Sequence, residues 1–453
     1  MTANGLLPIE RNFGQHGCRV KGGCSLAGER RADENMALST MHTLWVREHN
    51  RIAGGLKRLN PGWNDEKLFQ EARKIVGGIM QHIVYTEYVP LLVALAPYRG
   101  YNSHVNPSVI NAFSHAAFRY GHSLVPNHFE QLDQGYNKKY EPLLLQEAFR
   151  NRHLINVRGI EPMMFGLLKN KTRNVDDRFA FSLARKLFIP VGHSGHLDLT
   201  AINVQRGRDH GLPGYNAYRK LCRLPVMRSW NDVHRTLIAG VGAKLQRIYK
   251  HPNDIDLFAG GISEKAGRGY QVGPLFQCIF KQQFEALRDG DRFFYLNSGV
   301  FTTAQLHAIK KVSMATVLCN NLKGIVSVQP KALWEATGNN IRKVCFGGAI
   351  HQLDLNAWKG EQNDCPEKQD MVKDADVSNE ELQDEIDEAK EQENEENDAE
   401  YEEVVADNEE DQANVSQDET SPDISDEEFD IKAKEIENVL QKDDEQQNED
   451  KNQ

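Results

Sequence analysis

The stretch FRYGHSL, residues 118–124, is the one from which we interpret the rest of the chain. It closes a longer segment, residues 109–125, that is apolar at regular intervals. The apolar residues follow the i, i+3, i+4 and i+7 spacing of one helix face: Phe113, Ala116, Ala117 and Tyr120. This spacing predicts a single helix with one buried face, and His122 lies near its end, just after Gly121. The glycine lets a flat, bulky group approach the backbone, although a lone histidine also fits a partly buried structural role.

A second unusual stretch is DLTAINVQRGRDHG, residues 198–211, which begins apolar and then becomes densely polar. Its polar side chains are Asn203, Gln205, Arg206, Arg208, Asp209 and His210. Such density beside an apolar run indicates partly buried polar groups, each of which needs a hydrogen-bond partner. A salt-linked surface loop fits the same residues, so this stretch alone does not decide between the two interpretations.

A third stretch, GERRADEN at residues 28–35, precedes a clear helical pattern. The buried face of that helix is predicted to consist of Leu38, Met41, Leu44, Trp45, Ile52 and Leu56. The acids before it suit the start of a helix, and taken alone Arg31 and Glu34 fit an exposed ion pair at helical spacing. The segment HTLWVREH, residues 42–49, does not match the HExxH motif, which argues against a zinc protease.

The rest of the first 360 residues also favours helices. A second long helix is predicted to bury Leu68, Ala72, Ile75, Val76, Ile79, Met80 and Ile83. Shorter helical patterns cover residues 162–168, 177–187, 217–223, 233–249, 274–287 and 304–319. Residues 126–155 are expected to be irregular, and alternation typical of strands is scarce. The fold class predicted from these patterns is therefore mainly α.

Charge divides the 453 residues into two parts. Residues 366–453 contain 36 acidic and 7 basic residues, a net charge of −29, whereas residues 1–365 contain 29 acidic and 47 basic residues, a net charge of +18. We predict a globular domain over residues 1–365 and a largely disordered acidic tail over 366–453. A stripe of Phe429, Ala433, Ile436 and Leu440 could form a short helix near 429–440 on a protein partner, although acidic tails more often only solvate.

Several classes of function receive little support. The positive charge of the body is spread out and accompanied by no binding motif, which argues against a nucleic-acid partner. No run of 18 apolar residues is present, so no membrane span is predicted, and no signal peptide is visible in residues 1–28. None of the seven cysteines forms a CxxC pair, which argues against a zinc ribbon or a thioredoxin-like site. Their spacing leaves disulfide connectivity open, and the odd count mildly favours a reduced protein.

Taken together, these segments resemble the animal haem peroxidase family, the myeloperoxidase–peroxidasin group, with the peroxidasin branch nearest. The shared motifs lie in family order within about residues 5–358: GERRADE, HTLWVREHNR, QEARKIVGGIMQHI, FRYGHSL, AINVQRGRDHGLPGYN and LRDGDRFFY. Several long motifs at consistent separations are specific, whereas any one of them alone is weak. The resemblance implies a helical peroxidase fold, haem as the cofactor and a secreted protein.

The resemblance also implies a role for each matching residue on the proximal side of a haem. His122 matches the axial ligand of the haem iron, and Asn203 matches the residue that accepts a hydrogen bond from the other ring nitrogen. Arg119 matches a partner of a haem propionate, for which a guanidinium fork is suited. Arg206 is expected near the haem edge.

On the opposite, distal side, Arg31 matches the arginine that stabilises charge as the peroxide O–O bond breaks. Glu34 matches the glutamate that forms an ester with a haem methyl group. Asn35 stands where myeloperoxidase has a sulfonium-forming methionine, so no third covalent link is expected. The disulfides implied by the resemblance are Cys18–Cys24, Cys222–Cys278 and Cys319–Cys345, which leaves Cys365 spare.

Other family residues have no match in this chain. The distal histidine, the haem-esterified aspartate and the calcium ligands precede the GERRADE motif in the family, and His16 does not match the distal position. We therefore expect a peroxidase-like fold that lacks its N-terminal distal segment and its calcium loop. The function expected is a haem peroxidase that reduces hydrogen peroxide, oxidises halide or small organic donors and serves the response to oxidative stress. The alternative is a catalytically impaired haem-binding or interaction module, because losing a positioned acid–base group costs about 10²–10⁴-fold in rate.

Overall fold

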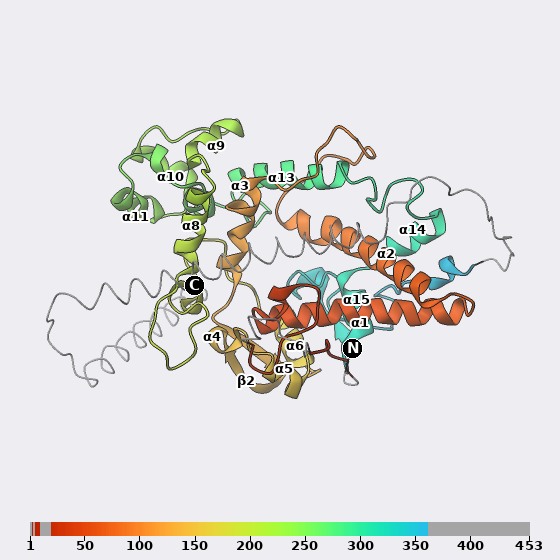
Figure 1. The fold of residues 1–453 in the computed structure, drawn as a ribbon. Helices are drawn as coiled ribbons and strands as arrows, with labels where there is room; N and C mark the ends of the chain where they lie inside the picture. Colours follow the sequence, from red (N-terminus) through yellow and green to blue (C-terminus); the bar gives the residue numbers. More distant parts are fainter. Residues whose placement is uncertain (1, 3–4, 10–19, 361–453) are drawn as a thin grey trace, which may run out of the picture. The chain divides into compact units, whose positions relative to one another are not determined.

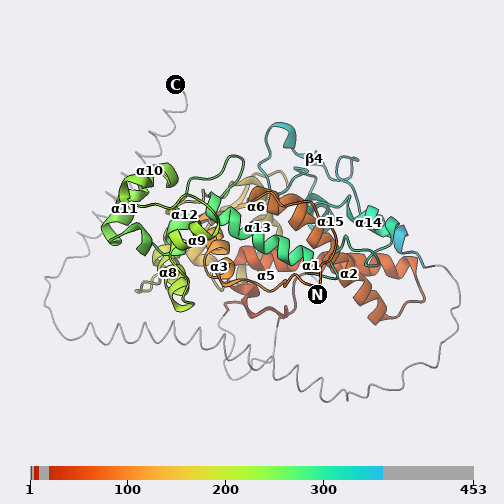
Figure 2. The same cartoon turned by 90° about the horizontal axis from the view of Figure 1, so that it is seen from above.

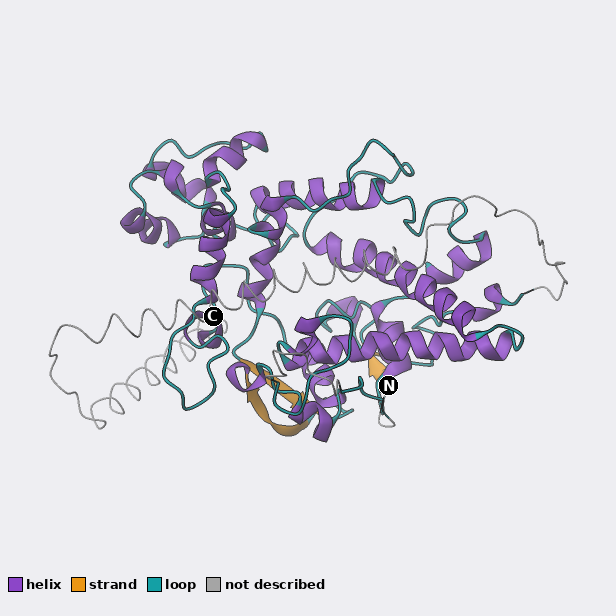
Figure 3. Ribbon diagram, viewed as in Figure 1, coloured by secondary structure: helices purple, strands orange, loops and turns teal. Residues whose placement is uncertain are grey.

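The computed structural model describes residues 2, 5–9 and 20–360, which lie within one compact unit, Met1–Gln362. Helices dominate this part of the chain, with two short antiparallel strand pairs (Figure 3). The mainly α fold class is therefore confirmed. The predicted tail of residues 366–453, its helix near 429–440 and Cys365 lie outside the described residues, so those expectations remain predictions. Among the described residues, no helix combines the length and the apolar character that crossing a bilayer requires.

Two long helices, α1 (Met36–Leu59) and α2 (Asp65–Ile83), pack against each other (Figure 1). Each begins at an asparagine whose side chain accepts a backbone N–H, Asn35 from Leu38 at 3.0 Å and Asn64 from Lys67 at 2.9 Å. The predicted buried faces are largely confirmed, and Met80 is the exception because it is 40% exposed. After α2 the chain continues through a π-helical turn, η2 (Val84–Tyr88), and a 3₁₀ turn, η3 (Val89–Leu91).

Two clusters of buried apolar side chains hold the described part together. The first joins α1 and α2 to α6 (Glu161–Lys169), α14 (Thr303–Ile309) and α15 (Met314–Asn321). The second joins η4 (Ala117–Leu124), α12 (Leu257–Ile262) and α13 (Pro274–Asp289). It is rich in aromatic rings, including Tyr120, Tyr215, Phe276 and Phe280.

The remaining elements are shorter. The α-helices are α3 (Asn111–Ser114), α4 (Leu145–Ala148), α5 (His153–Arg158), α7 (Phe181–Arg185), α8 (Leu199–Asp209), α9 (Tyr215–Leu221), α10 (Val233–Thr236) and α11 (Val241–Ile248). The 3₁₀ turns are η1 (Arg30–Asp33), η5 (Trp230–Asp232), η6 (Pro252–Asp254), η7 (Gly338–Asn340) and η8 (Leu355–Trp358). Figure 2 shows α8, α9 and α12 gathered together, and α12 also contacts α13.

Four sequence expectations were wrong in detail. Residues 109–125 do not form one helix, because Ala116 has φ −139° and ψ −71° and separates α3 from the 3₁₀ segment η4. Residues 233–249 divide into α10 and α11 at Gly240, whose φ is +81°, and residues 304–319 divide where Ser313 caps α15. Residues 126–155 contain a β-hairpin of β1 (His128–Leu132) and β2 (Lys138–Leu144), in which His128 pairs with Leu144.

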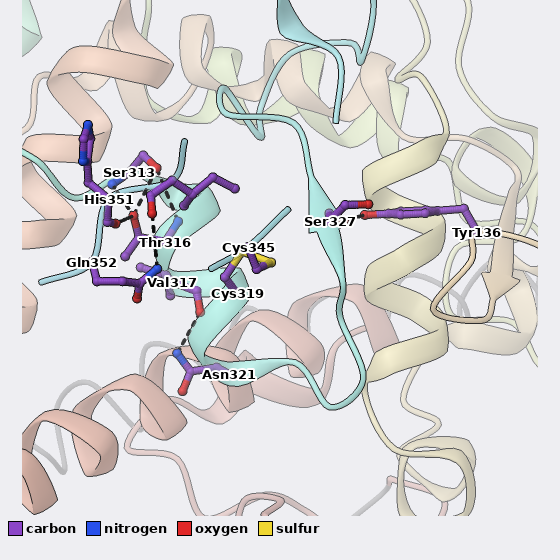
Figure 4. The surroundings of a disulfide bond; sticks show 11 residues. Tyr136, Ser313, Thr316, Val317, Cys319, Asn321, Ser327, Cys345, His351 and Gln352 are labelled. Carbon is purple, nitrogen blue, oxygen red and sulfur yellow. Dashed lines mark hydrogen bonds between the residues drawn. A yellow bond between two sulfur atoms is a disulfide. The ribbon is translucent and has the colours of Figure 1, made fainter. Parts of the chain in front are cut away.

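Two of the disulfides implied by the resemblance are present. Cys222 bonds to Cys278, which ties the end of α9 to α13. Cys319 of α15 bonds to Cys345, which follows strand β4 (Lys343–Val344), the partner of β3 (Ser327–Val328) (Figure 4). Cys18 lies outside the described residues, so the Cys18–Cys24 pair remains a prediction.

Candidate functional site

The FRYGHSL and AINVQRGRDHG stretches meet at a partly buried hydrogen bond. His122 Nδ1 lies 3.1 Å from Asn203 Oδ1, although 81 residues separate the two positions. An amide oxygen only accepts, so Nδ1 carries the proton and Nε2 keeps its lone pair. Arg119 Nη1 donates to the same oxygen at 3.2 Å, which fixes the orientation of the amide. His122 thus has the tautomer that a metal ligand needs, and none of the described residues is hydrogen bonded to Nε2.

Local contacts hold both sides of this pair. On η4, the Ser123 hydroxyl donates to the Tyr120 carbonyl at 2.8 Å, and the hydroxyls of Tyr120 and Tyr88 lie 2.9 Å apart. On the other side, the Asp198 carboxylate caps α8 by accepting the Thr200 N–H at 2.7 Å. Asn203 follows on the next turn of α8 and is fully buried.

Both segments also lie where the two apolar clusters meet. Leu124 packs on the second cluster and Val125 on the first. On α8, Ile202 packs on the first cluster and Val204 on the second. Because both segments contact both clusters, His122 and Asn203 have little freedom to separate.

The surroundings of His122 keep its imidazole neutral. Burial and, to a smaller extent, the positive charge of Arg119 lower the pKa of His122 to about 4, although the hydrogen bond to Asn203 acts in the opposite direction. At neutral pH the ring is therefore uncharged, which is the state that binds a metal ion.

Two observations bear on whether a bound group fits beside His122. Asn203 Nδ2 is buried and has no hydrogen-bond partner among the described residues. A buried donor without an acceptor costs about 1–3 kcal/mol, so it is available to a bound group. A Cβ placed on Gly121 would meet no atom within 4 Å, so the space next to the histidine backbone is open. These features fit a flat cofactor that takes one protein ligand.

Metal binding by protein side chains alone is not indicated elsewhere. The described residues contain no group of three or more His, Cys, Asp or Glu side chains that could hold an ion. A metal ion at His122 would therefore have one protein ligand here and would need the remaining ligands from a group such as a macrocycle.

Of the two arginines expected on the proximal side, Arg119 is hydrogen bonded to Asn203, whereas Arg206 lies further along α8. The Nε atom of Arg119 donates to the Ser114 carbonyl at 3.1 Å, in addition to its bond with Asn203. Arg206 lies three residues after Asn203 and hence on the same face of α8. Its side chain is 17% exposed, and Nη1 lies 3.7 Å from Asp209 Oδ2.

The residues expected on the distal side have different surroundings. Arg31 lies in η1, its side chain is 70% exposed, and two of its nitrogens each lie 3.0 Å from a carboxylate oxygen of Glu29. Glu34 follows η1, and its carbonyl accepts the N–H of Arg150 at 3.1 Å. The structure therefore joins His122, Asn203 and Arg119 in one network and places Arg31 in a separate, local ion pair.

The sequence reasoning missed a buried network beside Arg31. Asp33 is 3% exposed and accepts from the Ser25 hydroxyl at 2.7 Å and from the Ser39 hydroxyl at 3.0 Å. The buried guanidinium of Arg152 donates to the Ser25 hydroxyl at 2.7 Å. Acidic residues are common at the start of a helix, so nothing in the sequence indicates that Asp33 is buried. The burial becomes visible only with Arg152, which bonds to Ser25 from 127 positions away.

Known proteins resemble this chain in sequence and in fold. The family model described as animal haem peroxidase matches residues 1–333. The chain is 43% identical over 312 residues to peroxidasin of Drosophila melanogaster, which covers 66% of this chain and 20% of that protein. It is 41% identical over 353 residues to eosinophil peroxidase of Mus musculus, which covers 74% of this chain and 48% of that protein. Among solved structures, peroxidase A from Dictyostelium discoideum aligns with a TM-score of 0.62 at 36% identity, covering 67% of this chain and 58% of the other. The chain thus spans less than half the length of these two curated relatives.

Proposed function

This chain belongs to the animal haem peroxidase family, and we propose from that premise that it binds haem through His122 and reduces hydrogen peroxide. The electrons come from halide ions or small organic donors. Because the reaction removes hydrogen peroxide, the protein serves the response to oxidative stress. The observation that carries the proposal is the hydrogen bond from His122 Nδ1 to Asn203, which leaves Nε2 unprotonated.

The chain's own residues have distinct tasks in this proposal. His122 donates the Nε2 lone pair to the iron, and Asn203 keeps the proton on Nδ1 while it increases the basicity of the ring. Arg119 and Arg206 have planar guanidinium groups that suit the carboxylates of haem propionates. When bound, haem supplies the iron centre at which the peroxide O–O bond is broken.

Arg31 and Glu34 complete the proposal on the other side. Arg31 stabilises the charge that develops on peroxide, and Glu34 offers a carboxylate for an ester with a haem methyl. Arg31 must first leave Glu29, but an exposed ion pair of this kind contributes only about 0–1 kcal/mol. The ion pair between Arg31 and Glu29 also favours a second function, a haem-binding module with impaired catalysis, because it holds Arg31 on a neighbouring residue.

We also propose that the protein works in an oxidising, extracellular environment. The support is the pair of disulfides, Cys222–Cys278 and Cys319–Cys345, which persist in secreted proteins and are rare in reducing compartments. Mass spectrometry of the natural protein under non-reducing conditions should find both bonds, and finding free thiols at these positions would contradict the proposal.

A haem titration tests the central assignment. The wild-type chain should develop a Soret band that saturates at one haem per chain, and His122→Ala should lose the axial ligation signature. Added imidazole should restore the band in that variant if the lesion is only the missing ligand. His128→Ala, which removes an exposed histidine, is the matched control and should behave like the wild type.

Peroxide consumption by the loaded wild-type chain then separates the two functions. Turnover supports the peroxidase, whereas a normal haem spectrum without turnover supports the impaired haem-binding module. An unchanged haem spectrum in His122→Ala would remove the assignment on which both depend.

A further inference from the structure

A cavity lies between η2, α13 and the turn that follows α13. Its volume is about 690 Å³, within the range of about 300–1,000 Å³ that is usual for small-molecule sites. Five of its twelve lining residues are aromatic: Tyr85, Tyr101, Phe284, Phe293 and Phe294. Asp291 and Arg292 are the charged ones, and the Arg292 guanidinium lies 4.6 Å from the centre of the Phe293 ring. Phe293 and Tyr101 are 65% and 46% exposed, so the aromatic lining reaches the surface.

Aromatic rings connect this cavity to the segment that carries His122. Tyr120, two residues before His122, lies 5.4 Å from Phe280 between ring centroids, and Phe280 lies 6.4 Å from Phe284. Phe284 lies 6.1 Å from Tyr85, and both of these rings line the cavity. These separations are those of rings in van der Waals contact. Electron tunnelling weakens steeply with distance, and the rings of Phe280 and Phe284 bridge the space between Tyr120 and Tyr85 through close contacts.

The two ends of the ladder are tyrosines with hydrogen-bonded hydroxyls. The Tyr85 hydroxyl donates to the Phe284 carbonyl at 2.9 Å, and the Tyr120 hydroxyl lies 2.9 Å from that of Tyr88. Tyr85 and Tyr88 both lie in the π-helical turn η2, a type of distortion that is frequent at functional sites. Burial raises the pKa of Tyr85 and of Tyr120 above the usual range, so both are protonated phenols at neutral pH. Loss of an electron from such a phenol also releases its proton, and water in the cavity that Tyr85 lines can take up that proton.

We propose that the cavity binds phenolic electron donors and that the ring ladder carries their electrons to the haem side of His122. This inference rests on the proposed function, because peroxide reduced at the haem is the oxidant. Each phenol gives up one electron and one proton and becomes a phenoxyl radical. Two phenols supply the two electrons and two protons that convert one hydrogen peroxide into two waters.

The cavity has groups for both parts of a phenol. The ring stacks against the exposed Phe293, and the hydroxyl donates to Asp291 at the rim. Asp291 already accepts from Gln81 Nε2 at 2.9 Å and from the Phe293 N–H at 2.8 Å, and a carboxylate has lone pairs left for a third donor. The phenol proton then leaves through this carboxylate to water, while the electron enters Tyr85.

Binding is tested on the haem-free chain with p-cresol as the probe, by saturation-transfer NMR. We expect saturable binding that Phe293→Ala weakens about fivefold, the loss of one aromatic contact. Phe346→Ala is the matched control, because Phe346 is 68% exposed but does not line the cavity. Absence of binding, or equal weakening by both variants, overturns the assignment of the cavity.

The ladder is tested on the haem-loaded chain with Tyr85→Phe, which keeps the ring and removes the oxidisable hydroxyl. This variant should bind p-cresol like the wild type but oxidise it more slowly under peroxide. In the absence of donor, a nitroso spin trap followed by peptide mass spectrometry should locate a radical on Tyr85 or Tyr101 in the wild type, and Tyr85→Phe should lose that adduct. Tyr136→Phe is the control, because Tyr136 is a buried tyrosine whose hydroxyl likewise donates to a carbonyl, that of Ser327, at 2.9 Å (Figure 4).

The outcomes separate this inference from the proposed function. Unchanged p-cresol oxidation and unchanged radical adducts in Tyr85→Phe overturn the ladder and leave the peroxidase intact. Failure of the wild type to take up haem overturns the proposed function and the ladder with it, whereas the NMR measurement still decides whether the cavity binds phenols.

Discussion

The His122 region and the Arg31 region are expected to serve opposite faces of one cofactor, yet the structure holds them in contrasting ways. His122 is bonded to Asn203, 81 residues away, and the asparagine is fully buried. Arg31 is bonded to Glu29, two residues away, and its side chain is 70% exposed. A partly buried bond between distant segments is fixed by the fold itself, whereas an exposed bond between neighbours is readily exchanged. The His122 side is thus preorganised, whereas Arg31 can exchange its partner.

The backbone beneath Arg31 is nevertheless firmly held. Asp33, two residues later, is buried among the hydroxyls of Ser25 and Ser39, and Arg152 donates to the same Ser25 hydroxyl. The contrast between the two regions therefore concerns the functional side chain and not the segment that carries it.

The largest effect on stability is expected from Asp33→Asn. This change removes a buried carboxylate that is positioned to offset the charge of Arg152, and removing one partner from a buried charged network costs about 3–5 kcal/mol. Urea unfolding of the haem-free chain measures the loss. Asp65→Asn, at an exposed acid in the first turn of α2, is the control. Equal, small losses in both variants would show that the Arg31 segment is not anchored as described.

A pH dependence of stability is expected from His122. Its pKa is about 4 in the folded chain and has the ordinary histidine value of 6.5 in the unfolded chain, so between these values the unfolded chain binds more protons. The stability that depends on neutral His122 is therefore fully present above about pH 6.5. As the pH falls toward 4, the free energy of unfolding decreases by about 3 kcal/mol. The unfolding free energy of the wild type should fall more steeply over this window than that of His122→Gln. Parallel pH curves would mean that His122 is not buried in neutral form.

A smaller loss is expected from Asn203→Ala. The change deprives the donors of His122 and Arg119 of their common acceptor, at a cost of about 1–3 kcal/mol in the haem-free chain. The same variant should bind haem more weakly, because the imidazole is no longer held in one tautomer. Gln205→Ala, at an exposed position of the same helix, should change neither measurement. Wild-type haem affinity in Asn203→Ala would contradict the idea that His122 is preorganised for haem.

The smallest effect on stability is expected from Arg31→Ala, within about 1 kcal/mol, because an exposed ion pair contributes little. Peroxide consumption by the haem-loaded variant should nevertheless fall if Arg31 turns toward the peroxide. The comparison between the two regions would fail if this variant lost as much stability as Asn203→Ala.

Periodicity predicted the long helices well because their buried faces repeat along the chain, as Leu44, Ile52 and Leu56 do in α1. It failed for the β-hairpin of residues 128–144, because register shifts on both sides of Gln131 break the alternation that identifies a strand. Periodicity also predicted one helix where the structure has α3 and η4. The spacing of the buried residues fits either arrangement: Phe113, Ala116, Ala117 and Tyr120.

For the site, the motifs named His122, Asn203, Arg119, Arg206, Arg31 and Glu34 but could not place them. Asp33 was overlooked because a carboxylate near a helix start is usually exposed, and only distant contacts reveal its burial. The ladder from Tyr120 to Tyr85 was invisible for the same reason, since its rings come from η4, α13 and η2.

The sequence alone determined the helical class, the family resemblance and the residue types available to a haem, because these depend on local spacing and on motifs read along the chain. Only the tertiary structure decided which of those residues meet. Hydrogen bonds such as that of His122 with Asn203 join segments whose sequence separation carries no local signal, and their strength comes from burial that the folded chain creates.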